Sequence, residues 1–138
     1  MPLPRIGITM GDPTGIGPEI IVKALTREEP FQACHPVVFG DPGVFLKTIK
    51  RFGREVSLEV VHRIPEGGYA SRKIYLFPTS LLDAESLRIG KPDQACGEAM
   101  VNAIRLATQY VTEGELRAIT TCPINKQAIH TPDIVASG

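Results

Sequence analysis

The chain has 138 residues, enough for one domain with a hydrophobic core of its own. Fifteen acidic residues balance fifteen basic ones, so the chain lacks the overall charge that would attract nucleic acid or an anionic membrane surface. No apolar run approaches the roughly 20 residues of a membrane-spanning helix, and the first residues lack the apolar segment and cleavage site of a signal peptide.

The cysteines argue against a disulfide framework and against a structural zinc site. They are odd in number and widely spaced without a C-x-x-C pair, and they are Cys34, Cys96 and Cys122. This usage is typical of a reducing compartment, so we expect the protein in the cytoplasm.

Apolar runs of strand type alternate with helical patterns along the chain. We expect strands near residues 6–10, 36–39, 56–61, 74–77 and 116–121, and helices near 20–25, 44–52 and 95–112. Residues 26–30 look like the charged end of the first helix, which Pro30 terminates. Residues 78–93 have no clear period and predict a long connection, which is more often functional than idle. This alternation predicts an α/β domain with a largely parallel sheet.

The first strand is followed by a loop, residues 11–19, with the sequence GDPTGIGPE. A loop between strand and helix places backbone at the carboxyl end of the sheet, where α/β domains bind ligands. Gly11, Gly15 and Gly17 permit a tight turn and the close approach of a partner. Their spacing matches neither the dinucleotide-binding pattern nor the P-loop.

Helix formation accounts for part of this loop. Gly17 is a candidate N-cap, Pro18 suits the first helical turn, and Glu19 interacts favourably with the helix dipole. Asp12 and Glu19 would repel a phosphate, so a cationic or metal-bound partner fits better. A purely structural role in turn formation and capping explains the loop equally well.

A second junction of strand and loop follows at residues 120–126, and it should lie at the same edge of the sheet. There Asp12, Thr121, Asn125 and Lys126 can converge as a substrate or active-site loop. Lys126 is the best candidate to contact a phosphate or carboxylate, and a solvated surface lysine is the alternative. Asn125 is a candidate N-cap.

The sequence gives little support for a cysteine nucleophile or for histidine metal ligands. Cys122 follows a strand, but without an apparent partner histidine it is better explained as a buried, inert thiol. His35, His62 and His130 lack metal-ligand spacing, so we interpret each as a surface or loop histidine.

Two motifs carry a family resemblance. They are residues 8–19, with the sequence ITMGDPTGIGPE, and residues 121–126, with the sequence TCPINK. Gly90, Lys91 and Gly97, ahead of an alanine-rich helix, fit as well. With these features the chain resembles the amino-terminal part of the 4-hydroxythreonine-4-phosphate dehydrogenase family of pyridoxal phosphate biosynthesis.

The resemblance implies a fold like that of isocitrate and isopropylmalate dehydrogenases, with two α/β/α lobes, the active site between them, and a homodimer. It implies an oxidoreductase that uses NAD or NADP to oxidise and decarboxylate 4-phosphohydroxy-L-threonine to 3-amino-2-oxopropyl phosphate. A divalent zinc, magnesium or cobalt ion would hold the substrate hydroxyl and amine. A similar subfamily acts instead on D-threonate or D-erythronate 4-phosphate.

The sequence also departs from that family. A Gly-His-Thr-Glu motif that binds substrate is absent, and none of the three histidines matches a metal ligand of the family. The resemblance places the metal-binding histidines of the family beyond Gly138, the last residue of this sequence. We therefore expect no metal ligand of the family within the chain.

This departure leads to an expectation about how much of the fold is present. Residues 1–131 should form part of one lobe, and residues 132–138 should be an atypical tail of the kind that a frameshift or truncated reading frame produces. This chain alone should be inactive. A non-catalytic remnant or interaction fragment is the alternative, and an acyl-phosphate transferase relative is less favoured.

Overall fold

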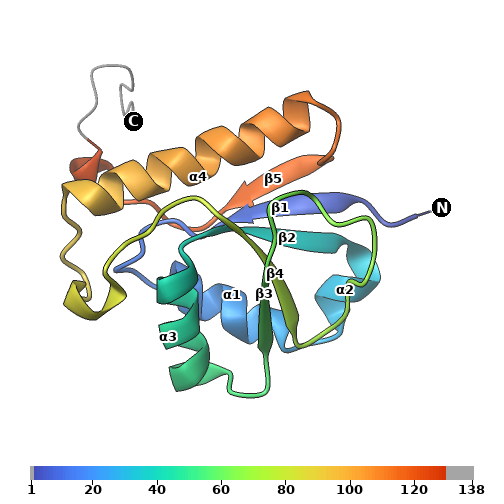
Figure 1. The fold of residues 1–138 in the computed structure, drawn as a ribbon, viewed down its shortest axis with the longest axis horizontal. Helices are drawn as coiled ribbons and strands as arrows, with labels where there is room; N and C mark the ends of the chain where they lie inside the picture. The colour runs from blue at the N-terminus through green and yellow to red at the C-terminus, as the bar shows by residue number, and fades with distance from the viewer. Residues whose placement is uncertain (1, 130–138) are drawn as a thin grey trace.

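The computed structural model describes residues 2–129, which form one sheet with helices on both faces (Figure 1). The strands are β1 (Arg5–Thr9), β2 (His35–Gly40), β3 (Ser57–Val60), β4 (Lys73–Pro78) and β5 (Ala118–Thr121). The helices are α1 (Gly17–Leu25), α2 (Glu29–Ala33), α3 (Pro42–Phe52) and α4 (Gln94–Thr112). Short 3₁₀ turns occupy Ala84–Ser86 and Lys126–Ala128. His130 and the predicted tail as far as Gly138 lie outside the described residues.

The sheet has the strand order β3-β4-β2-β1-β5, and each neighbouring pair is parallel. Strand β1 therefore lies between β2 and β5, with Thr9 opposite Phe39 on one side and Thr121 on the other. The prediction of a parallel α/β sheet is confirmed. The parallel arrangement brings the loops that follow β1 and β5 to one edge of the sheet.

Alternate residues of β2 show how the core is divided between two layers. Val38 packs with the residues of α1 and α3, whereas Val37 and Phe39 pack with Ala103 and Ala107 of α4. Successive side chains of a strand point to opposite faces, so one buried strand supplies both cores. In Figure 1, α4 covers one face of the sheet and α1 and α3 cover the other. Three layers result, as predicted.

Two expectations about the first helices were wrong. Ile16, not Gly17, is the N-cap of α1, and Gly17 is already the first helical residue. Residues 26–30 do not simply end that helix, because α2 begins at Glu29 with Pro30 in its first turn. Proline is compatible with the first turn of a helix, since the N–H that it lacks has no helical partner there. Pro18 occupies the equivalent place in α1, as predicted.

Local signals also mark the ends of the long helix α4. Asp93 is its N-cap, with a side chain that accepts a hydrogen bond from the Cys96 N–H at 2.9 Å. Gly114 follows its last residues with φ of +83°, a conformation that glycine adopts without strain. Within the described residues, no helix combines the length and apolarity needed to cross a bilayer.

Candidate active site at the carboxyl edge of the sheet

The two motif loops meet at the carboxyl edge of the sheet. The Cys122 N–H donates to the Thr9 carbonyl at 3.1 Å and extends the contact between β1 and β5 by one residue. The Asp12 N–H then donates to the Pro123 carbonyl at 2.9 Å. Residues more than a hundred positions apart are thus joined through their backbones, and the predicted convergence of the two junctions is confirmed.

Two of the loop glycines are required by this contact. Gly11 has φ of +73°, and a Cβ at this position would collide with the backbone of Cys122 and Pro123. A Cβ on Gly17 would collide with the Met10 carbonyl oxygen. Gly15 differs, because it is exposed and a Cβ there would approach Asp12 at an ordinary 3.4 Å. Packing within the chain therefore explains Gly11 and Gly17 but does not explain Gly15.

The carboxylate of Asp12 shapes its own loop. Its Oδ1 accepts hydrogen bonds from the N–H of Thr14 at 2.8 Å and from the Thr14 hydroxyl at 2.7 Å. Asp12 is only 8% exposed and Thr14 is fully buried. This carboxylate therefore forms an Asx turn. The role in turn formation that the sequence analysis gave as an alternative is thus present.

A shallow hollow of about 570 Å³ lies beside this turn, and we call it the edge hollow. Its lining residues come from both loops and are Asp12, Gly15, Ile16, Pro123, Ile124, Asn125 and Lys126. Three of the four predicted site residues are thus together. Thr121 is exposed at the end of β5 but does not line the hollow. Asn125 stands directly before a 3₁₀ turn, and its carbonyl accepts a hydrogen bond from the Ala128 N–H at 3.2 Å.

Glu19 does not line the edge hollow. Its carboxylate accepts a hydrogen bond from the Lys23 ammonium at 2.7 Å, one turn further along α1. The pair is partly exposed, so it contributes little to stability. Asp12 is therefore the acidic residue of this loop that lines the edge hollow, and Glu19 is not.

Burial disfavours the thiolate form of the two cysteines near the site. Burial raises the pKa of Cys122, whose Sγ lies 3.9 Å from the Gly17 carbonyl oxygen. Burial also raises the pKa of Cys96 to about 11. A thiol with a raised pKa is a poor nucleophile at neutral pH, because the thiolate is the reactive form. The raised pKa supports the interpretation of Cys122 as an inert thiol, although its side chain is half-buried rather than buried.

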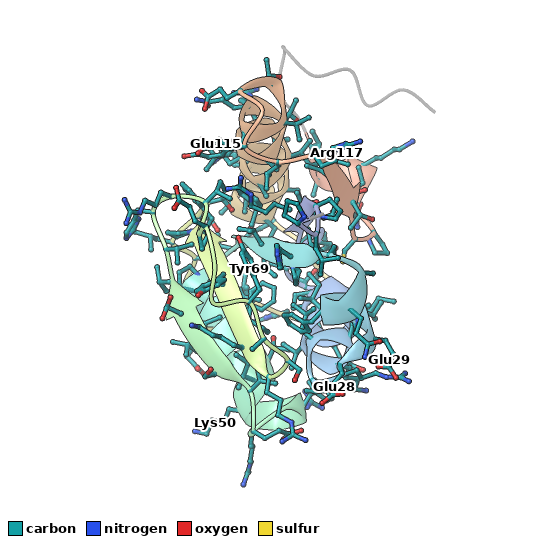
Figure 2. All side chains as sticks on the ribbon, turned by 90° about the vertical axis from the view of Figure 1, so that its right-hand side faces the viewer. Glu28, Glu29, Lys50, Tyr69, Glu115 and Arg117 are labelled. Carbon is teal, nitrogen blue, oxygen red and sulfur yellow. The ribbon has the colours of Figure 1, made fainter. Side chains whose placement is uncertain are left out.

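One histidine contradicts its predicted environment. His35 is not a loop residue, since it begins β2, and it is half-buried, with its ring stacked on Tyr69 and the ring centroids 4.4 Å apart. Figure 2 labels Tyr69, whose pKa burial raises to about 12. His62 is exposed in a loop, as predicted.

The described residues offer no metal centre of their own. Within residues 2–129, no three His, Cys, Asp or Glu side chains are grouped to hold a metal ion. We predicted that the metal-binding histidines of the family lie beyond Gly138. Those positions are outside the described residues, so this stays a prediction.

Sequence reasoning missed the role of Asp41. This buried carboxylate caps α3 by accepting a hydrogen bond from the Val44 N–H at 3.0 Å. Its other oxygen accepts hydrogen bonds from the Ser80 hydroxyl at 2.9 Å and the Leu82 N–H at 2.6 Å. An aspartate directly before a proline at a helix start is an N-cap signal that identifies the first contact. No local sequence pattern indicates its contacts with Ser80 and Leu82.

Comparison with known proteins decides the family. A family model described as pyridoxal phosphate biosynthetic protein PdxA matches residues 32–138. The chain belongs to the PdxA family. A 4-hydroxythreonine-4-phosphate dehydrogenase from Desulforapulum autotrophicum is 40% identical over 126 residues, which cover 91% of this chain and 37% of that protein. A putative D-threonate 4-phosphate dehydrogenase from Clostridium botulinum is 34% identical over 131 residues, which cover 95% of this chain and 39% of that protein.

Solved structures agree with this PdxA assignment. The crystal structure of a 4-hydroxythreonine-4-phosphate dehydrogenase from Burkholderia phymatum superposes with a TM-score of 0.87 at 32% identity. The match covers 93% of this chain and 38% of that one. A terephthalate 1,2-cis-dihydrodiol dehydrogenase from Burkholderia xenovorans matches with a TM-score of 0.67 at 28% identity. The chain therefore spans well under half the length of its relatives, and the two-lobed architecture stays a prediction.

Proposed function

We propose that this chain is part of an NAD- or NADP-dependent dehydrogenase that converts 4-phosphohydroxy-L-threonine to 3-amino-2-oxopropyl phosphate in pyridoxal phosphate biosynthesis. The observation that carries the proposal is the joining of residues 11–19 to residues 121–126, the two motifs of the family resemblance, at the carboxyl edge of the sheet. The 40% identity with a relative named 4-hydroxythreonine-4-phosphate dehydrogenase supports it. We further propose a cytoplasmic homodimer.

Within this chain, the edge hollow forms one wall of the substrate cleft. Lys126 and Asn125 supply hydrogen-bond donors for the anionic substrate, and a lysine ammonium is a common partner of phosphate. Gly15 keeps the backbone beside Asp12 accessible, which fits a ligand that lies close to the loop. When bound, NAD or NADP supplies the hydride acceptor for the oxidation of the substrate's 3-hydroxyl. The resulting β-keto acid then loses carbon dioxide.

The divalent metal implied by the family does not fit the described residues by themselves. Asp12 is the acidic residue of the edge hollow, and its Oδ1 already accepts two hydrogen bonds. Zinc, magnesium or cobalt needs several oxygen, nitrogen or sulfur ligands, and no group of three lies among residues 2–129. We assign no step to a metal held by these residues alone.

One experiment tests the activity and the substrate together. In a chimaera, this chain replaces the matching segment of the Desulforapulum relative, which contributes the rest of the protein. We expect NADH or NADPH formation with 4-phosphohydroxy-L-threonine. The alternative substrates are D-threonate 4-phosphate, for which the 34% identical Clostridium relative is named, and D-erythronate 4-phosphate. A folded chimaera that oxidises none of the three contradicts the proposal.

A pair of variants tests the edge hollow. Lys126→Gln in the chimaera should raise the KM of the phosphorylated substrate about 10-fold, because a hydrogen bond to a charged group is lost. The control is Arg117→Gln, which changes an exposed cation at the opposite end of β5 (Figure 2). Equal effects of the two substitutions would show that the edge hollow does not contact the substrate.

The chain alone is proposed to have no turnover. A non-catalytic remnant or interaction fragment would also have no turnover. The chimaera therefore distinguishes such a fragment from part of a dehydrogenase. A remnant would yield a folded but inactive chimaera. Reduction of NAD or NADP by the isolated 138-residue chain would contradict both.

A further inference from the structure

A second hollow lies at the amino end of the sheet, opposite the edge hollow, and we call it the amino-end hollow. It is bounded by the starts of β1 and β2, the loop before β4 and the connection from α4 to β5. Its volume of about 520 Å³ falls within the range of small-molecule sites in proteins. Figure 2 faces this end of the sheet and labels two of the lining residues, Glu115 and Arg117.

Three nitrogen-bearing side chains stand in a row across the start of the sheet. Arg5 on β1 is the register partner of His35 on β2. On the other side of Arg5, its carbonyl accepts a hydrogen bond from the Arg117 N–H at 2.8 Å, directly before β5 begins. Side chains at paired positions of neighbouring strands point to the same face, and all three residues line the hollow. This basic row, Arg117, Arg5 and His35, therefore faces one ligand.

The basic row lacks an anionic partner within the described chain. None of the salt bridges among residues 2–129 involves Arg5 or Arg117. The Nδ1 atom of His35 is buried and has no hydrogen-bond partner among these residues. A buried nitrogen without a partner costs free energy, and two neighbouring guanidinium groups repel each other. A carboxylate bound against the row removes both penalties.

Acidic side chains line the same hollow without neutralising the row. Glu66 and Glu115 both line it, and neither forms a salt bridge within residues 2–129. The hollow also adjoins the carboxyl end of α4, whose last turn carries no basic residue. Two carboxylates and the negative end of a helix dipole favour a positively charged group. A ligand with charges of both signs therefore fits better than a simple anion, which the glutamates would repel.

The loop that carries Glu66 is held in place. The Tyr69 hydroxyl donates to the Pro65 carbonyl at 2.6 Å, and the Tyr75 hydroxyl donates to the Gly67 carbonyl at 3.0 Å. The Tyr69 ring also stacks on the histidine of the basic row. A wall fixed by these contacts needs no ordering when a ligand arrives, and such preorganisation favours binding.

We propose that the amino-end hollow binds a zwitterionic amino acid with an aliphatic side chain. The carboxylate lies against the basic row and the ammonium group lies against the two glutamates. The side chain lies against Leu3 and Val111, which are half-buried on the wall of the hollow. The site is at the opposite end of the sheet from the edge hollow, and it does not depend on the proposed dehydrogenase activity.

The test is ligand-observed NMR on the 138-residue chain with three probes. They are L-leucine, isocaproate, which lacks the ammonium group, and isoamylamine, which lacks the carboxylate. L-leucine should bind in a saturable manner and about 10-fold more tightly than either analogue, because each analogue loses one charged contact. Absence of saturable leucine binding would overturn the proposal. So would isocaproate binding as tight as that of leucine, because the hollow would then be a site for simple anions.

Two substitutions should give opposite patterns. Arg5→Gln should weaken L-leucine and isocaproate about 10-fold and leave isoamylamine unchanged. Glu115→Gln should weaken L-leucine and isoamylamine and leave isocaproate unchanged, and it should keep the fold intact because Glu115 is exposed. A misfolded variant would lose all three probes, so the retained analogue reports an intact hollow.

Matched controls separate the hollow from the general surface. Lys50→Gln and Glu28→Gln change exposed charges that do not line the hollow, and both residues are labelled in Figure 2. Neither substitution should change the affinity for any probe. Equal effects of the test and control variants would overturn the proposal, as would a Glu115→Gln variant that binds all three probes like the wild type.

Discussion

Asp41 and Leu82 are joined by a 2.6 Å hydrogen bond from the Leu82 N–H to the Asp41 carboxylate, across 41 positions of the sequence. The same carboxylate caps α3 through Val44 and accepts a hydrogen bond from the Ser80 hydroxyl. One buried side chain thus fixes the start of a helix and the start of the connection that follows β4.

Removing this carboxylate should destabilise the protein. We expect Asp41→Ala to lower the free energy of unfolding by roughly 2–4 kcal/mol, because the N-cap is lost and buried donors become unpaired. Urea unfolding followed by circular dichroism measures the change. The control is Asp83→Ala, since Asp83 is exposed and its side chain caps nothing in the following 3₁₀ turn. A loss of stability at Asp41 no larger than at Asp83 would contradict this account.

The residues around Asp41 also show what the sequence could and could not predict. Apolar runs and helical spacing identified the strands, and the carboxyl ends of parallel strands lie at one edge of a sheet. The convergence of Asp12, Asn125 and Lys126 could therefore be predicted, although Thr121, predicted with them, does not line the edge hollow. The contact of Asp41 with Leu82 depends on where an irregular connection folds back, and no periodicity encodes that. The stacking of His35 on Tyr69 was missed for the same reason.

The three loop glycines should respond differently to alanine. Gly11→Ala places a side chain at positive φ and against the Pro123 carbonyl, and Gly17→Ala collides with the Met10 carbonyl. We expect each to cost about 2–4 kcal/mol through strain and overpacking. Gly15→Ala should cost under about 1 kcal/mol, because a Cβ at that exposed position makes ordinary contacts. Thermal unfolding of the three variants tests this, and a loss at Gly15 equal to the other two would refute it.

The N-cap of α4 should give a pH-dependent contribution to stability. A hydrogen bond from the Cys96 N–H lowers the pKa of Asp93 below its usual value of 3.8. Because the pKa is lower in the folded state, the stabilisation is fully present above the usual carboxyl pKa and is lost as the pH falls through the folded value.

Asp93→Ala should therefore lower the free energy of unfolding by about 1 kcal/mol at pH 7. The difference between wild type and variant should shrink as acid protonates Asp93. Urea unfolding at neutral and acidic pH measures it, and a difference that does not depend on pH would exclude the carboxylate as its source.

The exposed edges of the sheet should promote association. Among the described residues β5 pairs only with β1, and β3 pairs only with β4, so each leaves one edge without a partner strand. Most residues of both strands are exposed. Unpaired parallel edges are templates for further strands, and a lysine on an edge strand opposes such pairing through charge and solvation.

We expect the isolated chain to form oligomers at increasing concentration, and Thr120→Lys on β5 to reduce them. Light scattering after size exclusion measures the mass, with Thr108→Lys on the exposed side of α4 as the control for added charge. A monomer at all concentrations, or an equal reduction by both lysines, would show that the β5 edge does not drive association.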